Sequence, residues 1–182
     1  MEYTPSLFPD VARDIFFDLE TLRLSQEVEG GWSSIANFGL AVGITWDAEN
    51  RFRRWFEQDV KALIAELGRF DRIITFNGER FDFEVLRGYH GVDALYKKSF
   101  DLLSDLHRKL GFRIKLDDLA QETLGHRKTG NGLDVVRWWR EDRIEEVCKY
   151  CENDVQLLVD LVEFARTTKH VVVKSRQLPV DW

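Results

Sequence analysis

The chain has 182 residues, of which 44% are hydrophobic, 13% aromatic and 32% charged. So many large apolar side chains exclude a mainly disordered protein, and two Cys are too few for a disulfide framework. The net charge of −6, from 26 Lys and Arg against 32 Asp and Glu, argues against a protein that binds nucleic acid through general basic charge.

The N-terminal sequence Met1–Pro5 lacks the basic region and apolar stretch of a signal peptide. No run approaches the 18 apolar residues that a membrane span needs. We therefore expect a cytoplasmic protein without a membrane segment. We also expect a single domain over 1–182, with its core at about 14–165.

The first elements predicted in chain order are strands. Residues 15–19 form a short apolar run that ends in acid, which is typical of a buried central strand. Residues 36–46 alternate with period two, and a turn at 47–50 joins them to a second strand at 52–56. The bulky side chains of the 36–46 strand are expected on one face: Phe38, Leu40, Val42, Ile44 and Trp46.

Helices and strands then alternate. Val60, Leu63, Ile64 and Leu67 have helical spacing, and Gly68 ends that helix. The later predicted elements are a strand at 72–76, helices at 79–88, 104–110 and 116–124, a strand at 99–103, a short amphipathic piece at 138–139 and a long helix at about 142–168. This order predicts a three-layer α/β/α fold with a mixed sheet of about five strands.

Two segments have an unusual composition. Residues 125–132 form a basic, glycine-rich loop, and the tail at 164–179 carries Arg166, Lys169, Lys174 and Arg176 without any acid. The simplest interpretation of the tail is a solvated chain end, since termini are loosely held. Cys148 and Cys151 form a C-x-x-C pair inside the long helix, where we expect them to be small core-facing residues.

Several carboxylates occupy positions that are costly unless the charge is paired or bound to metal. Asp18 and Glu20 end the first strand and face the same side, because they lie two residues apart. Asp82 follows the 72–76 strand. Asp154 lies one turn after Tyr150 on the long helix, at the border of its apolar stripe.

Each acid alone also suits a structural role, as a strand-end cap, a first-turn acid or a rim acid. Together, four carboxylates from three elements can converge and bind two hard divalent ions. Such a pair of ions is the usual device for displacement at a phosphate.

Three motifs in order resemble those of the DEDD, or DnaQ-like, 3′–5′ exonucleases of the ribonuclease-H-like superfamily. The first is Phe-Phe-Asp-Leu-Glu-Thr at 16–21, the second Asn-Gly-Glu-Arg-Phe-Asp at 77–82, and the third Tyr-Cys-Glu-Asn-Asp at 150–154. Tyr150 lies four residues before the last Asp, and in this position of the tyrosine the third motif resembles that of the DEDDy branch. The resemblance covers about residues 14–165, and small stand-alone YprB-like proteins are the nearest in length and style.

The resemblance implies a two-metal hydrolysis of terminal phosphodiester bonds at the 3′ ends of single-stranded DNA or RNA, which releases 5′-mononucleotides. Asp18, Glu20, Asp82 and Asp154 would hold two Mg²⁺ or Mn²⁺ ions, and Tyr150 would orient the attacking water. Residues expected to contact the substrate are Thr21, Leu24, Asn77, Phe81 and Lys128. Asp101, a fifth acid near a strand end, is interpreted as a structural cap.

Two alternatives use the same fold: a non-catalytic nucleic-acid-binding or scaffold domain, and a ribonuclease-H-like endonuclease. A dinucleotide-binding enzyme is disfavoured because no G-x-G-x-x-G follows the first strand. Two bound divalent ions would offset the acidic charge at the site. The net charge of −6 therefore argues only against a static nucleic-acid binder, and we expect weak, salt-sensitive binding of long strands.

Overall fold

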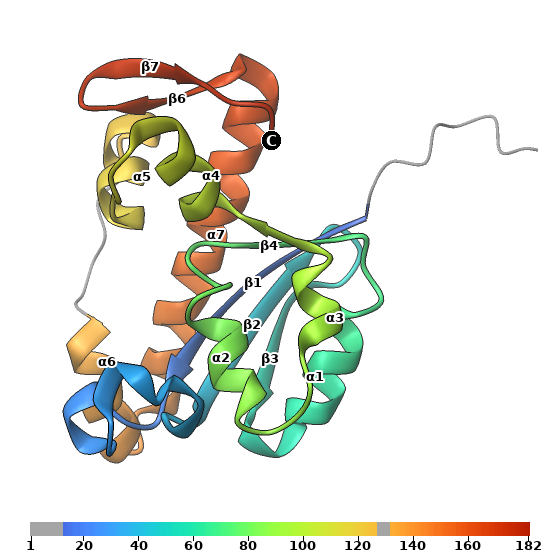
Figure 1. The fold of residues 1–182 in the computed structure, drawn as a ribbon, viewed down its shortest axis with the longest axis vertical. Helices are drawn as coiled ribbons and strands as arrows, with labels where there is room; N and C mark the ends of the chain where they lie inside the picture. Colours follow the sequence, from blue (N-terminus) through green and yellow to red (C-terminus); the bar gives the residue numbers. More distant parts are fainter. Residues whose placement is uncertain (1–12, 127–131) are drawn as a thin grey trace, which may run out of the picture.

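The computed structural model describes residues 13–126 and 132–182 (Figure 1). Its centre is a five-stranded sheet in the order β3-β2-β1-β4-β5. β1 pairs antiparallel with β2, and β2 with β3, whereas the β1–β4 and β4–β5 pairs are parallel. The predicted mixed sheet is confirmed. Its strands are β1 (Asp14–Thr21), β2 (Leu40–Asp47), β3 (Arg51–Phe56), β4 (Arg72–Thr75) and β5 (Ser99–Asp101).

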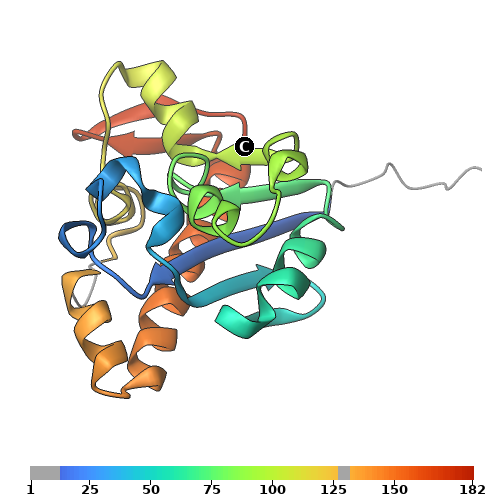
Figure 2. The ribbon, with the colours of Figure 1, turned by 60° about the horizontal axis from the view of Figure 1, so that its bottom comes forward.

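Helices cover both faces of this sheet, which gives three layers (Figure 2). Alternation along β1 feeds both cores, because Phe17 packs with one layer of helices and Phe16 with the other. None of the helices in the described ranges is long and apolar enough to cross a bilayer. The Phe17 side holds α1 (Val60–Leu67), α2 (Asp82–Arg87) and α3 (Asp93–Tyr96); the Phe16 side holds α4 (Leu102–Leu110), α5 (Leu116–Leu124), α6 (Gly132–Arg140) and α7 (Ile144–Thr168).

The strand predicted at 36–46 begins only at Leu40, so the prediction is wrong for residues 36–39. A 3-10 turn precedes it, and Gly39 takes a φ of +74°, a conformation that glycine adopts without a Cβ clash. The pairing with β1 also shifts register at this end. Consequently Phe38 and Leu40 pack with the α1–α3 layer, whereas Val42 lies under α7, and the bulky side chains do not share one face.

Asp101 decides where β5 ends. The strand predicted at 99–103 stops at Asp101, because this carboxylate accepts hydrogen bonds from the backbone N–H groups of Leu103 and Ser104 and so starts α4. The interpretation of Asp101 as a structural cap is confirmed. The helix predicted at 79–88 is shorter than expected and spans Asp82–Arg87.

The C-terminal segment is ordered, so its interpretation as a solvated end is wrong. After α7 the chain forms an antiparallel hairpin of β6 (His170–Val173) and β7 (Arg176–Pro179), which lies beside α5 and α7 (Figure 1). Val171 is fully buried, and the buried Trp182 donates its indole N–H to Asp105 at 2.9 Å. The apolar side chains of this segment hold it on the core despite its basic charge.

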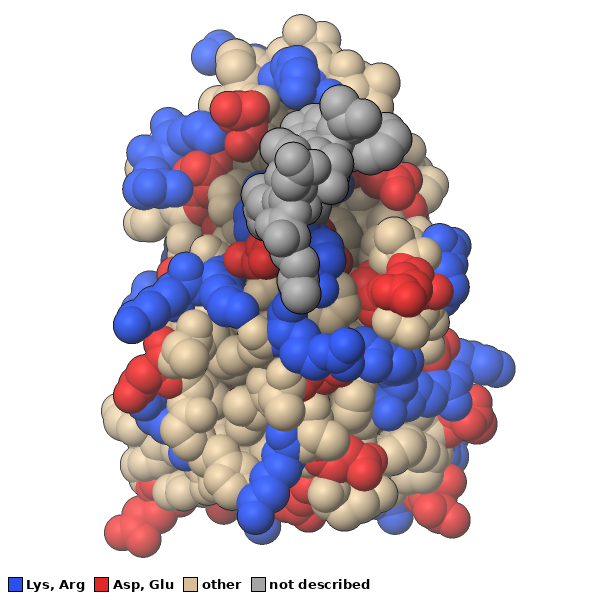
Figure 3. Space-filling view, turned by 90° about the vertical axis from the view of Figure 1, so that its right-hand side faces the viewer, with Lys and Arg blue, Asp and Glu red and all other residues tan. Residues whose placement is uncertain are grey.

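Ion pairs close the N-terminal end of β1. Arg72 donates to both carboxylate oxygens of Asp14, at 2.8 and 2.9 Å, and Arg166 of α7 pairs with the same carboxylate. Burial alone would raise the pKa of Asp14, but the hydrogen bonds from both arginines outweigh it and lower that pKa. Figure 3 shows Lys and Arg beside Asp and Glu on this side of the molecule. The two arginines here are therefore committed to internal pairs.

Candidate functional site

Three of the predicted carboxylates meet above the middle of the sheet. Asp18 and Glu20 are on β1, on the side of the strand that α7 covers, and Asp154 comes from α7 itself. One oxygen from each of the three carboxylates lies within 4.8 Å of the other two, and Asp154 is only 7% exposed. Elements far apart in the sequence thus place three negative groups at one point.

The chemistry of this donor set suits a hard divalent cation. Carboxylates at such spacing repel one another in a partly buried site, and a cation between them would relieve that repulsion. All three donors are oxygen ligands, the type that Mg²⁺ and Mn²⁺ prefer, and this group of three includes no His or Cys. The residues present therefore fit a magnesium or manganese site.

Asp82, the fourth predicted carboxylate, lies beside this cluster and is not one of its three members. It is the first residue of α2 and is 3% exposed, and its Oδ1 accepts a hydrogen bond from the backbone N–H of Leu19 at 3.1 Å. Burial raises the pKa of Asp82, and the nearby Asp18 carboxylate raises it further. Asp82 is thus tied to β1 between the two acidic residues of that strand.

Tyr150 is placed by two helices. It lies one turn before Asp154 on α7, is 7% exposed, and packs edge-on against Trp138 of α6 with 6.2 Å between ring centroids. Its position on the same helix as a cluster carboxylate follows from the i, i+4 spacing that the sequence contains. Packing by Trp138 limits the directions in which the phenol ring can turn.

The two cysteines of α7 are fully buried, as predicted for core-facing residues. Cys151 donates its thiol to Asp18 Oδ2 at 3.4 Å. Burial raises the pKa of Cys151, and the carboxylates of Asp18, Glu20 and Asp154 add to that effect. Cys151 is therefore a neutral thiol in contact with the acidic cluster.

A cavity of about 320 Å³ opens next to the cluster, and Glu20 belongs to both. Three of the residues predicted to contact substrate line it: Thr21, Leu24 and Phe81. Thr21 donates its hydroxyl to the carbonyl of Arg23 at 3.1 Å, which fixes the chain where it leaves β1. The predicted metal ligands and these contact residues therefore adjoin in space.

The same cavity contains residues that the sequence reasoning missed. Trp32, 67% exposed, lies 6.1 Å from Phe81 and 5.6 Å from Phe38, measured between ring centroids. Arg23 also lines the cavity. Trp32 is in a segment of short 3-10 turns between β1 and β2 that has no periodic pattern. The Gly-Gly-Trp sequence at 30–32, a large aromatic after two turn-forming residues, was the available signal.

Asn77, also predicted to contact the substrate, has its contacts outside the cavity. It adopts a φ of +72°, its backbone N–H donates to Asp101 at 2.9 Å, and its side-chain oxygen accepts a hydrogen bond from Arg113 at 2.6 Å. Asn77 does not line the cavity that holds Phe81. Lys128, the remaining residue predicted to contact substrate, lies outside the described residues.

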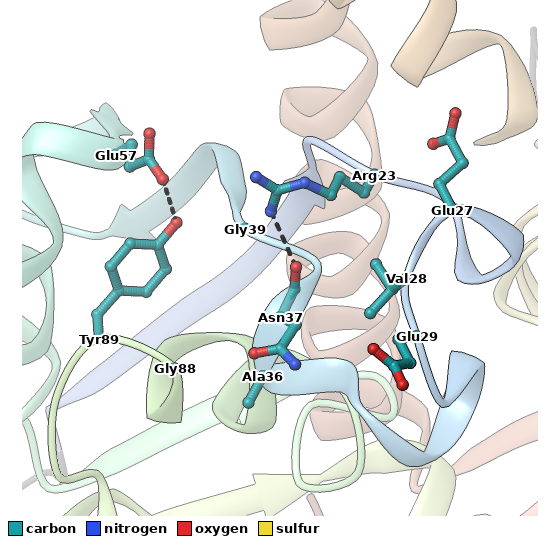
Figure 4. A pocket seen from close by; sticks show the side chains of 10 residues that line it. All are labelled: Arg23, Glu27, Val28, Glu29, Ala36, Asn37, Gly39, Glu57, Gly88 and Tyr89. Atoms are coloured by element: carbon teal, nitrogen blue, oxygen red, sulfur yellow. Dashed lines mark hydrogen bonds between the residues drawn. The ribbon is translucent and has the colours of Figure 1, made fainter.

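A second cavity, of about 440 Å³, is lined mainly by the segment between β1 and β2 (Figure 4). Tyr89 accepts a hydrogen bond from the backbone N–H of Leu40 at 2.8 Å and donates to Glu57 at 2.5 Å. Burial and that glutamate raise the pKa of Tyr89 to about 12. Arg23 donates to the Asn37 carbonyl at 2.9 Å. These contacts anchor the start of β2, and this cavity contains none of the predicted site residues.

Comparisons with known proteins agree with this architecture. A family model described as the RNase H superfamily matches residues 15–166. The structure is similar to that of a family B DNA polymerase from the hyperthermophilic archaeon Pyrobaculum calidifontis, with a TM-score of 0.62 and 16% identity. The match covers 88% of this chain but 25% of the polymerase chain. At that identity the likeness concerns the fold alone. No curated protein matches the chain.

Proposed function

The chain belongs to the RNase H superfamily, and on that premise we propose that it is a metal-dependent 3′–5′ exonuclease of the DEDDy type. Its substrates would be the 3′ ends of single-stranded DNA or RNA, and its products 5′-mononucleotides. The observation that carries the proposal is the meeting of Asp18, Glu20 and Asp154 within 4.8 Å, with Tyr150 one turn before Asp154 on α7.

Each acidic residue has a part in this proposal. Asp18, Glu20 and Asp154 would hold one divalent ion, and Asp18 with Asp82, through water, a second. Two such ions, when bound, supply an activated water nucleophile and offset the negative charge that develops at the phosphate. Tyr150 would orient the attacking water through its hydroxyl, because a phenol with an ordinary pKa near 10 is a poor base at neutral pH.

The cavity beside Glu20 would receive the terminal nucleotide. Phe81 and Trp32 offer aromatic faces, and base stacking of this kind does not depend on the identity of the base. Leu24, at the rim, would separate the terminal base from its neighbour, and Thr21 would fix the sugar. Asn77, in the loop between β4 and α2, would help to position the terminal nucleotide. We propose that the chain forms one such nuclease domain over 1–182, with its core at about 14–165, working in the cytoplasm.

The proposal is tested with 5′-labelled single strands of DNA and RNA in Mg²⁺ or Mn²⁺. We expect a ladder of products shortened from the 3′ end. Asp18→Asn and Asp154→Asn should each lower the rate at least about 100-fold, since each removes a charged oxygen ligand. Asp160→Asn, on the same helix but outside the cluster, is the matched control and should cleave like the wild type.

Two results would reject the proposal. If Asp18→Asn and Asp154→Asn cleave as fast as the control, the cluster is not the catalytic centre. If a circular single strand is cut as readily as a linear one, the activity is that of an endonuclease. Failure to bind Mn²⁺ by calorimetry, together with the absence of cleavage, would instead support a binding or scaffold domain.

A further inference from the structure

Two segments of the chain are strongly basic. Residues 107–115 contain four Lys or Arg and no Asp or Glu, and residues 164–179 do the same. Because the whole chain carries −6, the rest of it carries −14. Each of these two short segments, about 50 residues apart in sequence, therefore has a net charge of +4.

The fold brings these two segments together. The ammonium group of Lys174, in the turn between β6 and β7, lies 3.9 Å from the centre of the Phe112 ring, between α4 and α5. Thr123 of α5 exchanges hydrogen bonds with both backbone groups of Val172, at 3.0 and 3.2 Å. The hairpin turn is therefore held against the connection between α4 and α5.

The segment between α4 and α5 also contacts the loop that leads to the candidate site. Arg113, the neighbour of Phe112, donates to the side-chain oxygen of Asn77 at 2.6 Å. Asn77 begins the loop that leads to Phe81, in the cavity, and to Asp82, at the edge of the acidic cluster. A continuous series of contacts thus runs from the cluster to the hairpin turn.

Some cations of these segments are used internally. Arg108 and Lys109 pair with Asp105, and Arg166 pairs with Asp14 at the start of β1. Other cations of the two segments are exposed and have no salt bridge to any carboxylate within residues 13–126 and 132–182. Four of these we call the basic strip: Arg113, Lys115, Lys174 and Arg176.

Acids also lie close to the basic strip: Asp117 and Asp118 follow Lys115 in the first turn of α5, where negative charge stabilises the helix N-terminus. Two further acids accept hydrogen bonds from the backbone. Glu122 accepts a hydrogen bond from the backbone N–H of Ser175 at 2.7 Å. Asp101 accepts from several backbone N–H groups at the start of α4 and in the Asn77 loop. Both carboxylates are therefore held in place by backbone N–H groups.

We propose that the basic strip binds the backbone of a single-stranded nucleic acid whose 3′ end occupies the cavity beside Glu20. This inference rests on the proposed function and adds to it a second contact surface upstream of the cleaved bond. A single strand fits better than a duplex. The strip has only four cations, whereas the remainder of the chain carries −10 and would repel the denser charge of duplex DNA.

The test measures binding without cleavage. The anisotropy of a 5′-fluorescein-labelled twelve-nucleotide oligothymidylate is compared with that of a three-nucleotide one, in EDTA, over a range of salt concentrations. The variant is Lys174→Gln/Arg176→Gln. For single strands each neutralised phosphate contributes about −0.7 to the slope of log K against log salt. Loss of two contacts should then reduce the slope by about 1.4 and weaken binding of the longer strand about 25-fold at ~0.1 M salt.

The matched control is Lys61→Gln/Lys97→Gln, which removes the same charge from exposed positions in the α1–α3 layer. It should bind like the wild type. Because Lys174 packs on Phe112, its replacement can disturb the hairpin, so Lys115→Gln/Arg176→Gln is the second variant and should show the same loss. Thermal melting identifies any variant that does not fold.

Three outcomes would overturn the inference: both strip variants bind like the control, the three-nucleotide strand loses as much affinity as the longer one, or the wild type prefers a duplex. Failure of the proposed function looks different. In that case the strip variants lose strand binding in EDTA, but the wild type cleaves nothing in Mg²⁺ or Mn²⁺.

Discussion

Removal of the Asp101 carboxylate should destabilise the protein and loosen the loop that carries Asn77. Asp101 is 4% exposed. Its Oδ1 accepts from the backbone N–H groups of Asn77, Leu103 and Ser104 at 2.9, 2.9 and 3.2 Å, and its Oδ2 accepts from Glu79 at 3.2 Å. One side chain therefore joins the start of α4 to the loop between β4 and α2.

The magnitude follows from these contacts. Loss of a helix N-cap costs about 1–2 kcal/mol, and each loop N–H that loses its charged acceptor costs about 1 kcal/mol or more. Asp101→Ala should therefore lower the free energy of unfolding by about 3–4 kcal/mol. For a chain of this size that corresponds to a fall in Tm of roughly 10 °C.

The conservative variant separates the hydrogen bonds from the charge. In Asp101→Asn the side-chain oxygen can still serve Asn77, Leu103 and Ser104, so only the bond to Glu79 and the charge are lost. We expect a cost of about 1 kcal/mol. Urea unfolding and thermal melting measure both variants. An alanine variant within ~1 kcal/mol of wild type, or equal losses for both variants, would refute this account of Asp101.

Three further predictions concern the site. Trp32→Ala should raise KM for single-stranded ends roughly 5- to 160-fold, the range that corresponds to a stacking contact of about 1–3 kcal/mol, with little change in Tm because Trp32 is 67% exposed; an unchanged KM would remove it from the substrate site. Cys148 and Cys151 should react with Ellman's reagent only on unfolding, because burial raises the pKa of both thiols; fast reaction of the native protein would contradict their placement. Mn²⁺ at ~100 times its Kd should stabilise the wild type by about 2.7 kcal/mol in thermal melting but not Asp18→Asn; equal shifts would place the ion elsewhere.

The sequence predicts well those helices whose formation depends on local periodicity and local backbone preferences. The α1 helix was read from the spacing of four apolar residues between Val60 and Leu67, and it ends at the expected glycine. The α5 helix has the predicted bounds, 116–124, and the long helix differs only at its first residues. In these segments the periodic burial of side chains and the local backbone preferences favour the same structure.

The errors fall where distant contacts override a local pattern. The alternation over 36–46 continues through Phe38 and Leu40, yet a register shift against β1 moves these two into the other core. The charges of the C-terminal segment suggested a solvated end, but Val171 and Trp182 bury it against α5 and Asp105. Neither the register nor the hairpin is visible in the local sequence, because both depend on which residues pack opposite.

By itself the sequence indicated the layered fold and the acidic residues of the candidate site. The period of apolar positions and the cost of carboxylates at buried strand ends are local properties. Only the tertiary structure decided that Asp18, Glu20 and Asp154 form one cluster with Asp82 beside it, that Trp32 joins Phe81 in a cavity, and that two basic segments meet through Lys174 and Phe112. Chain packing decides such meetings, because residues far apart in sequence become neighbours only when their elements share a core.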